Sequence, residues 1–130
     1  MFDMREIDVH AAPPRRDTDG WFEYSGGGAV VLCPVGELDF STASELERRL
    51  TDIVESTDAP TILVDLSRVH FIDAGCVGVI LQSRANACRR NRALYVQGLS
   101  GVPATVFDAL GLRTALTPPT PGNDRGRRAP

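Results

Sequence analysis

The chain has 130 residues, of which 42% are hydrophobic and 24% charged, and its formal net charge is −3. This length suffices for one hydrophobic core, and the acidic balance disfavours a nucleic-acid binder, which needs a concentrated basic face. Three cysteines are too few for a disulfide scaffold, and no apolar run approaches the roughly twenty residues of a membrane span. We therefore expect a cytoplasmic, single-domain protein without a membrane or nucleic-acid partner.

The first part of the chain predicts a flexible lead followed by a hairpin. Residues 1–19 are mostly polar and include a Pro-Pro pair, which is typical of a lead without fixed structure. Strands are expected over 21–24 and 29–35, because apolar and aromatic residues flank the glycine run 26–28. The hairpin would open the folded domain.

A helix is expected over residues 42–56. Its buried face is predicted from apolar residues at helical spacing, namely Ala43, Leu46, Leu50, Ile53 and Val54. Ser41, Thr42 and Ser44 carry hydroxyls near the helix start. Thr42 and Glu45 have the spacing of a capping box, so we assign these hydroxyls a structural role.

The central part of the chain predicts a buried strand over 60–66 and a second helix over 74–90. Asp73 is a suitable N-cap for this helix. One helix face is expected to carry a stripe of residues at three- and four-residue intervals: Val77, Ile80, Leu81, Arg84 and Cys88. Cys88 would then belong to the core.

The last part of the chain predicts a strand over 93–96, a helix from Ser100 to Gly111 and a short edge strand over 112–116. Residues 117–130 are rich in proline, glycine and arginine, which indicates a disordered tail. The alternation of strands and helices favours an α/β fold in which helices cover a mixed β-sheet.

Two motifs resemble a known family. Residues 65–79 read DLSRVHFIDAGCVGV, and residues 36–39 read GELD, with Thr42 and Ala43 following. These motifs resemble the signature of the STAS domain, the fold of bacterial anti-sigma factor antagonists, in which D-L-S-x-V-x-F leads to an aspartate and a helix. The resemblance implies a single STAS domain over about 20–116.

The position after the motif aspartate departs from the family pattern. In antagonists that resemble this chain, a serine there is phosphorylated by the partner anti-sigma factor, which is a kinase, and the modification breaks the complex. This chain has Ala74, followed by Gly75 and Cys76. A methyl group has no nucleophilic oxygen, so we expect no control by phosphorylation at this site.

The resemblance implies a non-enzymatic anti-sigma factor antagonist that needs no cofactor. Its partner would be a kinase-fold, ATP-binding anti-sigma factor, and their binding would free a sigma factor. The residues expected at the partner surface are Asp39, Thr42, Asp73, Ala74, Gly75 and Cys76. The alternative is a STAS sensor or scaffold that binds a small ligand or another signalling protein. Whether the chain forms a homodimer stays open.

The three cysteines raise the alternative of redox control. Cys76 would lie in the first turn of its helix, where the dipole can lower a thiol pKa. Cys33 lies in a predicted strand, and Cys88 continues the helix stripe. Buried cysteine is also a common apolar filler, and both interpretations stay open.

The histidines do not indicate a metal site. His10 and His70 lie far apart and lack ligand spacing to any cysteine. The glycine run also lacks the lysine and hydroxyl residue of a phosphate-binding loop.

Overall fold

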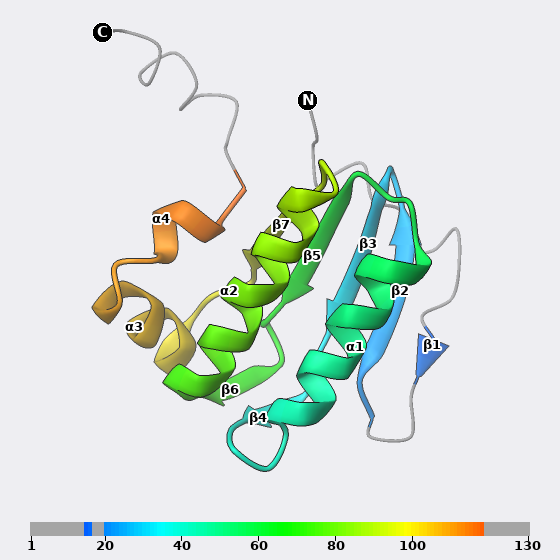
Figure 1. Ribbon diagram of the computed structural model, residues 1–130. Coiled ribbons are helices and arrows are strands. Elements are labelled where there is room, and N and C mark those ends of the chain that lie inside the picture. The colour runs from blue at the N-terminus through cyan, green and yellow to red at the C-terminus, as the bar shows by residue number, and fades with distance from the viewer. Residues whose placement is uncertain (1–14, 17–19, 119–130) are drawn as a thin grey trace, which may run out of the picture.

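The computed structural model describes residues 15–16 and 20–118 of the chain (Figure 1). The strands in this part are β1 (Arg15–Arg16), β2 (Phe22–Gly26), β3 (Ala29–Cys33), β4 (Gly36–Leu38), β5 (Thr61–Asp65), β6 (Val69–Ile72) and β7 (Ala93–Gln97). The helices are α1 (Ala43–Ser56), α2 (Ala74–Arg89), α3 (Gly101–Ala109) and α4 (Arg113–Leu116).

The larger sheet is mixed, as the sequence predicted. Its strand order is β1-β2-β3-β5-β7, with antiparallel pairing of β2 to β3 and parallel pairing of β5 to both β3 and β7. The β2–β3 turn confirms the predicted hairpin. Gly27 and Gly28 have φ values of 58° and 80°, the left-handed region that favours glycine.

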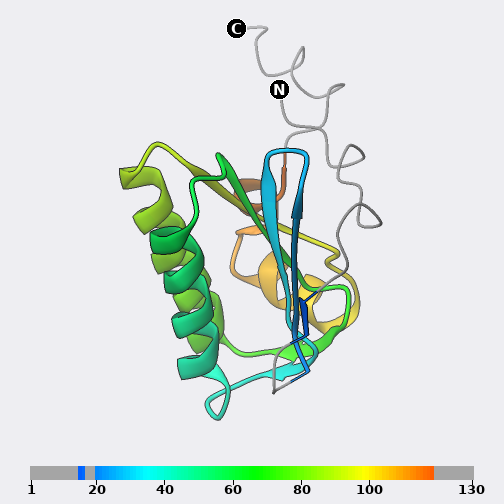
Figure 2. The ribbon, with the colours of Figure 1, turned by 90° about the vertical axis from the view of Figure 1, so that its right-hand side faces the viewer.

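Helices α1 and α2 lie side by side over one face of this sheet (Figures 1 and 2). Four of the five apolar residues predicted for the buried face of α1 are buried, which confirms the spacing argument: Leu46, Leu50, Ile53 and Val54. Arg49 is buried with them. Its guanidinium lies over the Trp21 ring, 5.7 Å from the centroid, and 3.7 Å from a carboxylate oxygen of Glu23.

The predicted edge strand over 112–116 is wrong. Gly111, with φ of 70°, ends α3, and the Leu112 N–H then donates to the Phe107 carbonyl. The backbone turns into α4, which places Leu116 in the core.

Strands β4 and β6 were not predicted. They form a separate two-stranded parallel sheet.

The expected core stripe of α2 is rotated. Its buried residues are Cys76, Val77, Ile80, Ser83 and Ala87. Cys88 is exposed, so its assignment to the core is wrong. Small residues at 83 and 87 allow α2 to pack closely against its neighbours, and a stripe read only from large apolar side chains misses them.

The predicted lead and tail are described only in part. Arg15 and Arg16 pair with β2 as β1, and Thr117 follows the end of α4. The rest of the predicted lead and residues 119–130 lie outside the described residues. Across 15–16 and 20–118, no helix has the length and apolar character needed to cross a membrane.

Arg92, just before β7, forms hydrogen bonds with groups at the end of α1 and just beyond it. Its guanidinium donates to the carbonyl oxygens of Val54 and Ala59 at 2.6 and 2.7 Å, and to the Thr57 hydroxyl at 2.8 Å. The last turn of a helix leaves carbonyl groups without intrahelical donors, and its dipole favours a cation there. Arg92 meets both requirements for α1.

Replacing Arg92 with alanine is expected to lower the free energy of unfolding by about 2 kcal/mol, because partly buried acceptors lose a charged donor. Urea unfolding followed by circular dichroism measures this change. Arg113→Ala is the control, since its ion pair with Asp108 lies at the surface and contributes at most about 1 kcal/mol. Equal losses in the two variants would contradict this role of Arg92.

Candidate functional site

Two chain segments distant in sequence meet at the starts of α1 and α2. The Asp73 N–H donates to the Leu38 carbonyl at 3.0 Å, and the Cys76 thiol donates to the Asp39 carbonyl at 3.4 Å. Because β4 and β6 are parallel neighbours, the residues that follow them emerge at the same edge. The loop after β4 therefore lies against the first turn of α2.

Asp73 caps α2, as predicted. Its backbone is extended, with φ of −99° and ψ of 170°, and its carboxylate accepts a hydrogen bond from the Cys76 N–H at 2.9 Å. This bond satisfies one of the donors that a helix leaves unpaired at its start. Asp73 thus fixes the direction in which Ala74 and Gly75 leave the small sheet.

The predicted capping box at α1 is wrong. Thr42 has φ of −113° and ψ of −2°, and its side chain makes no cap hydrogen bond to the helix. Its hydroxyl instead accepts from the Asp39 N–H at 2.9 Å and lies 3.1 Å from the Glu37 carbonyl, to which it can donate. Because the Thr42 backbone is nearly helical and not extended, its side chain points back towards the loop and not over the helix start. Thr42 therefore stabilises the loop after β4.

Asp39 and Ser41 close the same loop. The Asp39 carboxylate accepts from the Ser41 hydroxyl at 2.6 Å and from the Ser41 N–H at 2.9 Å. The hydroxyl bond, followed by the backbone bond, holds the pKa of Asp39 below its ordinary value of 3.8. Asp39 is consequently charged at neutral pH.

The first turn of α2 exposes very small residues. Ala74, Gly75 and Gly78 are exposed, whereas the Cys76 side chain is fully buried. A methyl group added at Gly78 would meet no atom within 4 Å, so no neighbour in the fold requires glycine there. Glycine inside a helix costs about 0.5–1 kcal/mol relative to alanine. Because glycine has no side chain, the α2 backbone at this position is open to close approach by another molecule. Cys76, predicted at the partner surface, has its side chain buried beneath that surface.

Phe40 was missed by the sequence analysis. It lies between Asp39 and Ser41, and 93% of its surface is exposed. Phe71, just before the α2 cap, is 41% exposed. A large aromatic residue inside an otherwise polar loop was the signal that could have found Phe40. We call the exposed parts of residues 39–41 and 73–75 the loop–helix surface.

The environment of Cys76 opposes the thiolate that the redox alternative requires. Burial, followed by the charges of Asp73 and Asp39, raises the pKa of Cys76 from 9.0 to about 12. Burial, followed by the charge of Asp65, raises the pKa of Cys33 to about 11. The helix dipole favours a thiolate, but desolvation and two nearby carboxylates outweigh it.

Only Cys88 is expected to react rapidly with a disulfide reagent in the folded protein at about pH 8, because the other two thiols are buried and protonated. Ellman's reagent measures the rates, and a fast phase in Cys88→Ser would contradict the prediction.

The raised pKa values of Cys33 and Cys76 also predict that the free energy of unfolding falls as the pH rises from about 9, where unfolded thiols ionise, towards 11 and 12.

The histidine within the described part of the chain pairs with a carboxylate. His70 contacts Glu37 across the small sheet through its Nε2 atom, and both side chains are exposed. Residues 15–16 and 20–118 contain no group of three or more histidine, cysteine, aspartate or glutamate residues that could hold a metal ion. His10 lies outside the described residues.

Comparison with known proteins decides the family. Residues 24–118 match the family model described as Mlab, STAS domain. The chain belongs to the STAS domain family. This match begins within β2 and covers both helices that pack on the sheet and the whole loop–helix surface, and it confirms the assignment suggested by the two sequence motifs.

Solved STAS structures have the same fold at low identity. The unphosphorylated anti-sigma factor antagonist SpoIIAA has a TM-score of 0.66 and 19% identity, over 83% of this chain and 95% of that one. An anti-sigma factor antagonist from Mycobacterium paratuberculosis has a TM-score of 0.68 and 19% identity, over 87% and 97%. A sulfate transporter family protein from Wolinella succinogenes has a TM-score of 0.59 and 22% identity, over 72% and 75%.

Proposed function

We propose that this STAS domain is a non-enzymatic anti-sigma factor antagonist that binds a kinase-fold, ATP-binding anti-sigma factor and thereby frees a sigma factor. The loop–helix surface is the proposed binding site, with Asp39, Asp73, Ala74 and Gly75 as predicted and Phe40 added. Thr42 and Cys76 support this surface from within. The likeness to two antagonist structures supports the class of partner.

The observation that carries this proposal is the exposed Phe40 beside a helix start that presents small residues. A protruding aromatic side chain is a frequent anchor at protein interfaces, and Ala74 with Gly75 allows a partner to reach the backbone around it. Asp39 and Asp73 add negative charge at the rim. Together these features match a surface that docks into an apolar pocket with basic edges.

Affinity capture from a native cell extract, with ADP present, tests the proposal. The expected result is enrichment of a kinase-fold protein, identified by mass spectrometry, on the wild-type chain and its loss on a Phe40→Asp bait. Enrichment of the same proteins on both baits would contradict the proposed site. Recovery of no kinase-fold protein would contradict the proposed partner class.

A STAS scaffold that binds a different signalling protein is the second candidate, and the lack of a phosphoacceptor at Ala74 favours it. The STAS fold also occurs in a sulfate transporter family protein, so the fold alone does not select a sigma-factor pathway. A captured protein without a kinase fold, lost on the Phe40→Asp bait, would favour this candidate.

A further inference from the structure

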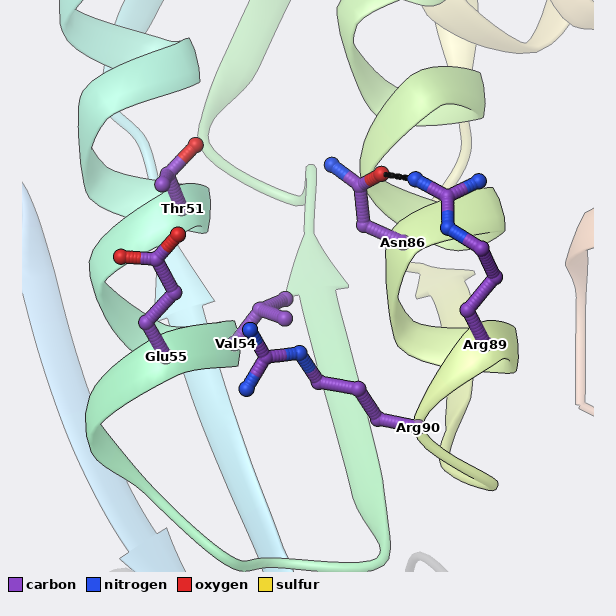
Figure 3. A pocket seen from close by; sticks show the side chains of 6 residues that line it. All are labelled: Thr51, Val54, Glu55, Asn86, Arg89 and Arg90. Atoms are coloured by element: carbon purple, nitrogen blue, oxygen red, sulfur yellow. Dashed lines mark hydrogen bonds between the residues drawn. The ribbon is translucent and has the colours of Figure 1, made fainter.

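A groove lies between the C-terminal ends of α1 and α2, at the opposite end of these helices from the loop–helix surface (Figures 1 and 3). One part has a volume of about 250 Å³ and is lined by Thr51, Val54, Glu55, Asn86, Arg89 and Arg90. A second part of about 370 Å³ shares Val54, Glu55 and Arg90 and continues to Arg92. Sites for drug-sized ligands typically have volumes of about 300–1,000 Å³, so the first part suits a smaller group.

The helix ends at this groove already have their hydrogen-bond partners. Arg92 donates to acceptors at and just beyond the last turn of α1, as described above. At the end of α2, the Ala87 carbonyl accepts from the N–H groups of Arg90 and Arg92, and the Cys88 carbonyl accepts from that of Asn91. The Arg90 side chain is therefore not needed to cap either helix.

Three donors point into the first part of the groove. Asn86 accepts from Arg89 through its Oδ1 atom, so its amide nitrogen faces α1 and the Thr51 hydroxyl (Figure 3). The Arg90 guanidinium extends across the groove towards Val54 (Figure 3). Within residues 15–16 and 20–118, the amide nitrogen of Asn86 and the side chains of Thr51 and Arg90 have no hydrogen-bond or ion-pair partner.

The groove carries an excess of positive charge, although the whole chain has a net charge of −3. The first part is lined by the guanidinium groups of Arg89 and Arg90 against the carboxylate of Glu55. Arg92 lies at the C-terminal end of α1, where its charge offsets the negative end of the helix dipole. Guanidinium, amide and hydroxyl donors around one hollow are suited to an oxyanion.

We propose that this groove binds a phosphate group, held by Arg90, the Asn86 amide and the Thr51 hydroxyl, with Arg89 orienting Asn86. The phosphate would belong to a small phosphorylated metabolite or to a lipid headgroup, since both present the same oxygens. Glu55 lies at the groove edge, where it can accept from a ligand hydroxyl. This site is separate from the loop–helix surface and does not depend on the proposed function.

Nuclear magnetic resonance titration of the labelled full chain with inorganic phosphate, at constant ionic strength, tests the proposal. The expected result is saturable shifts of the amides of Thr51, Asn86 and Arg90. Arg90→Gln should weaken phosphate binding about tenfold or more, because a charged donor is lost without loss of fold. Arg84→Gln, on the same helix but outside the groove lining, should leave binding unchanged.

Two further arms identify the source of the phosphate. Saturable binding of glycerol phosphate supports a metabolite, and binding only to vesicles that contain phosphatidic acid, but not to phosphatidylcholine vesicles, supports a headgroup. Either result must be lost in Arg90→Gln. Shifts that do not saturate with any probe, or equal weakening by Arg84→Gln and Arg90→Gln, would overturn the proposal.

Discussion

Replacing Phe40 with aspartate is expected to weaken binding of the kinase-fold partner at least about thirtyfold while the unfolding midpoint stays unchanged. The Phe40 side chain is almost fully exposed, so the fold gains little from it. A partner that buries the ring would lose its apolar contact and would have to bury a charge instead. Titration calorimetry with the captured partner measures the affinity, and thermal unfolding measures the midpoint.

Leu110→Asp is the matched control for Phe40→Asp. Leu110 is also a large exposed apolar residue, but it lies at the end of α3, away from the loop–helix surface. The control should retain the wild-type affinity. Comparable weakening in both variants, or a lower unfolding midpoint in Phe40→Asp, would show that Phe40 is not a specific anchor.

The Ala74→Ser variant is expected to accept one phosphoryl group from ATP when it is incubated with the captured kinase, and then to release that kinase. Residue 74 is exposed at the first position of α2, so a serine oxygen there can attack the terminal phosphorus while ADP leaves. The new phosphate would be stabilised by the α2 dipole, while its bulk and its charge would have to be accommodated and desolvated against the apolar pocket of the partner, which disfavours the complex.

Intact-mass analysis distinguishes the possible phosphoacceptors. The wild-type chain should gain no phosphoryl group, and Ala74→Ser should gain one. Ser41 is the nearby exposed hydroxyl that most needs a control, because it donates to Asp39 on the same surface. Phosphorylation of the wild-type chain that disappears in Ser41→Ala would contradict the conclusion that the phosphorylation switch is lost. An inert Ala74→Ser would show that Gly75 and Cys76 also changed the loop beyond recognition by the kinase.

Local sequence patterns were sufficient for the elements whose signals are short-range. Helical spacing of apolar residues predicted α1, and Asp73 before an apolar run predicted the cap that the Cys76 N–H confirms. The glycine run predicted the hairpin because left-handed backbone is cheap only for glycine. The motifs at residues 36–39 and 65–79 identified the STAS family and showed that residue 74 carries no hydroxyl.

Other features depend on contacts between residues far apart in the chain. Strands β4 and β6 have three and four residues, and they pair with each other although α1 and β5 lie between them in the chain. Thr42 had the spacing of a capping box, but its hydroxyl contacts the Asp39 N–H and the Glu37 carbonyl of the preceding loop instead of the helix. Cys76 was placed correctly in the first turn of α2, but its burial raises its pKa, whereas the helix dipole alone would lower it.

The sequence by itself determined the family, the mixed α/β architecture and the absence of a hydroxyl at position 74, because short motifs and local periodicity of neighbouring residues carry each of these signals. The tertiary structure alone decided that Phe40 is exposed, that Cys76 is buried beneath the loop after β4, and that Arg90 and Asn86 of α2 line one groove with Thr51 of α1. Exposure and convergence arise from the packing of whole elements, and no local periodicity records which side of a loop faces solvent.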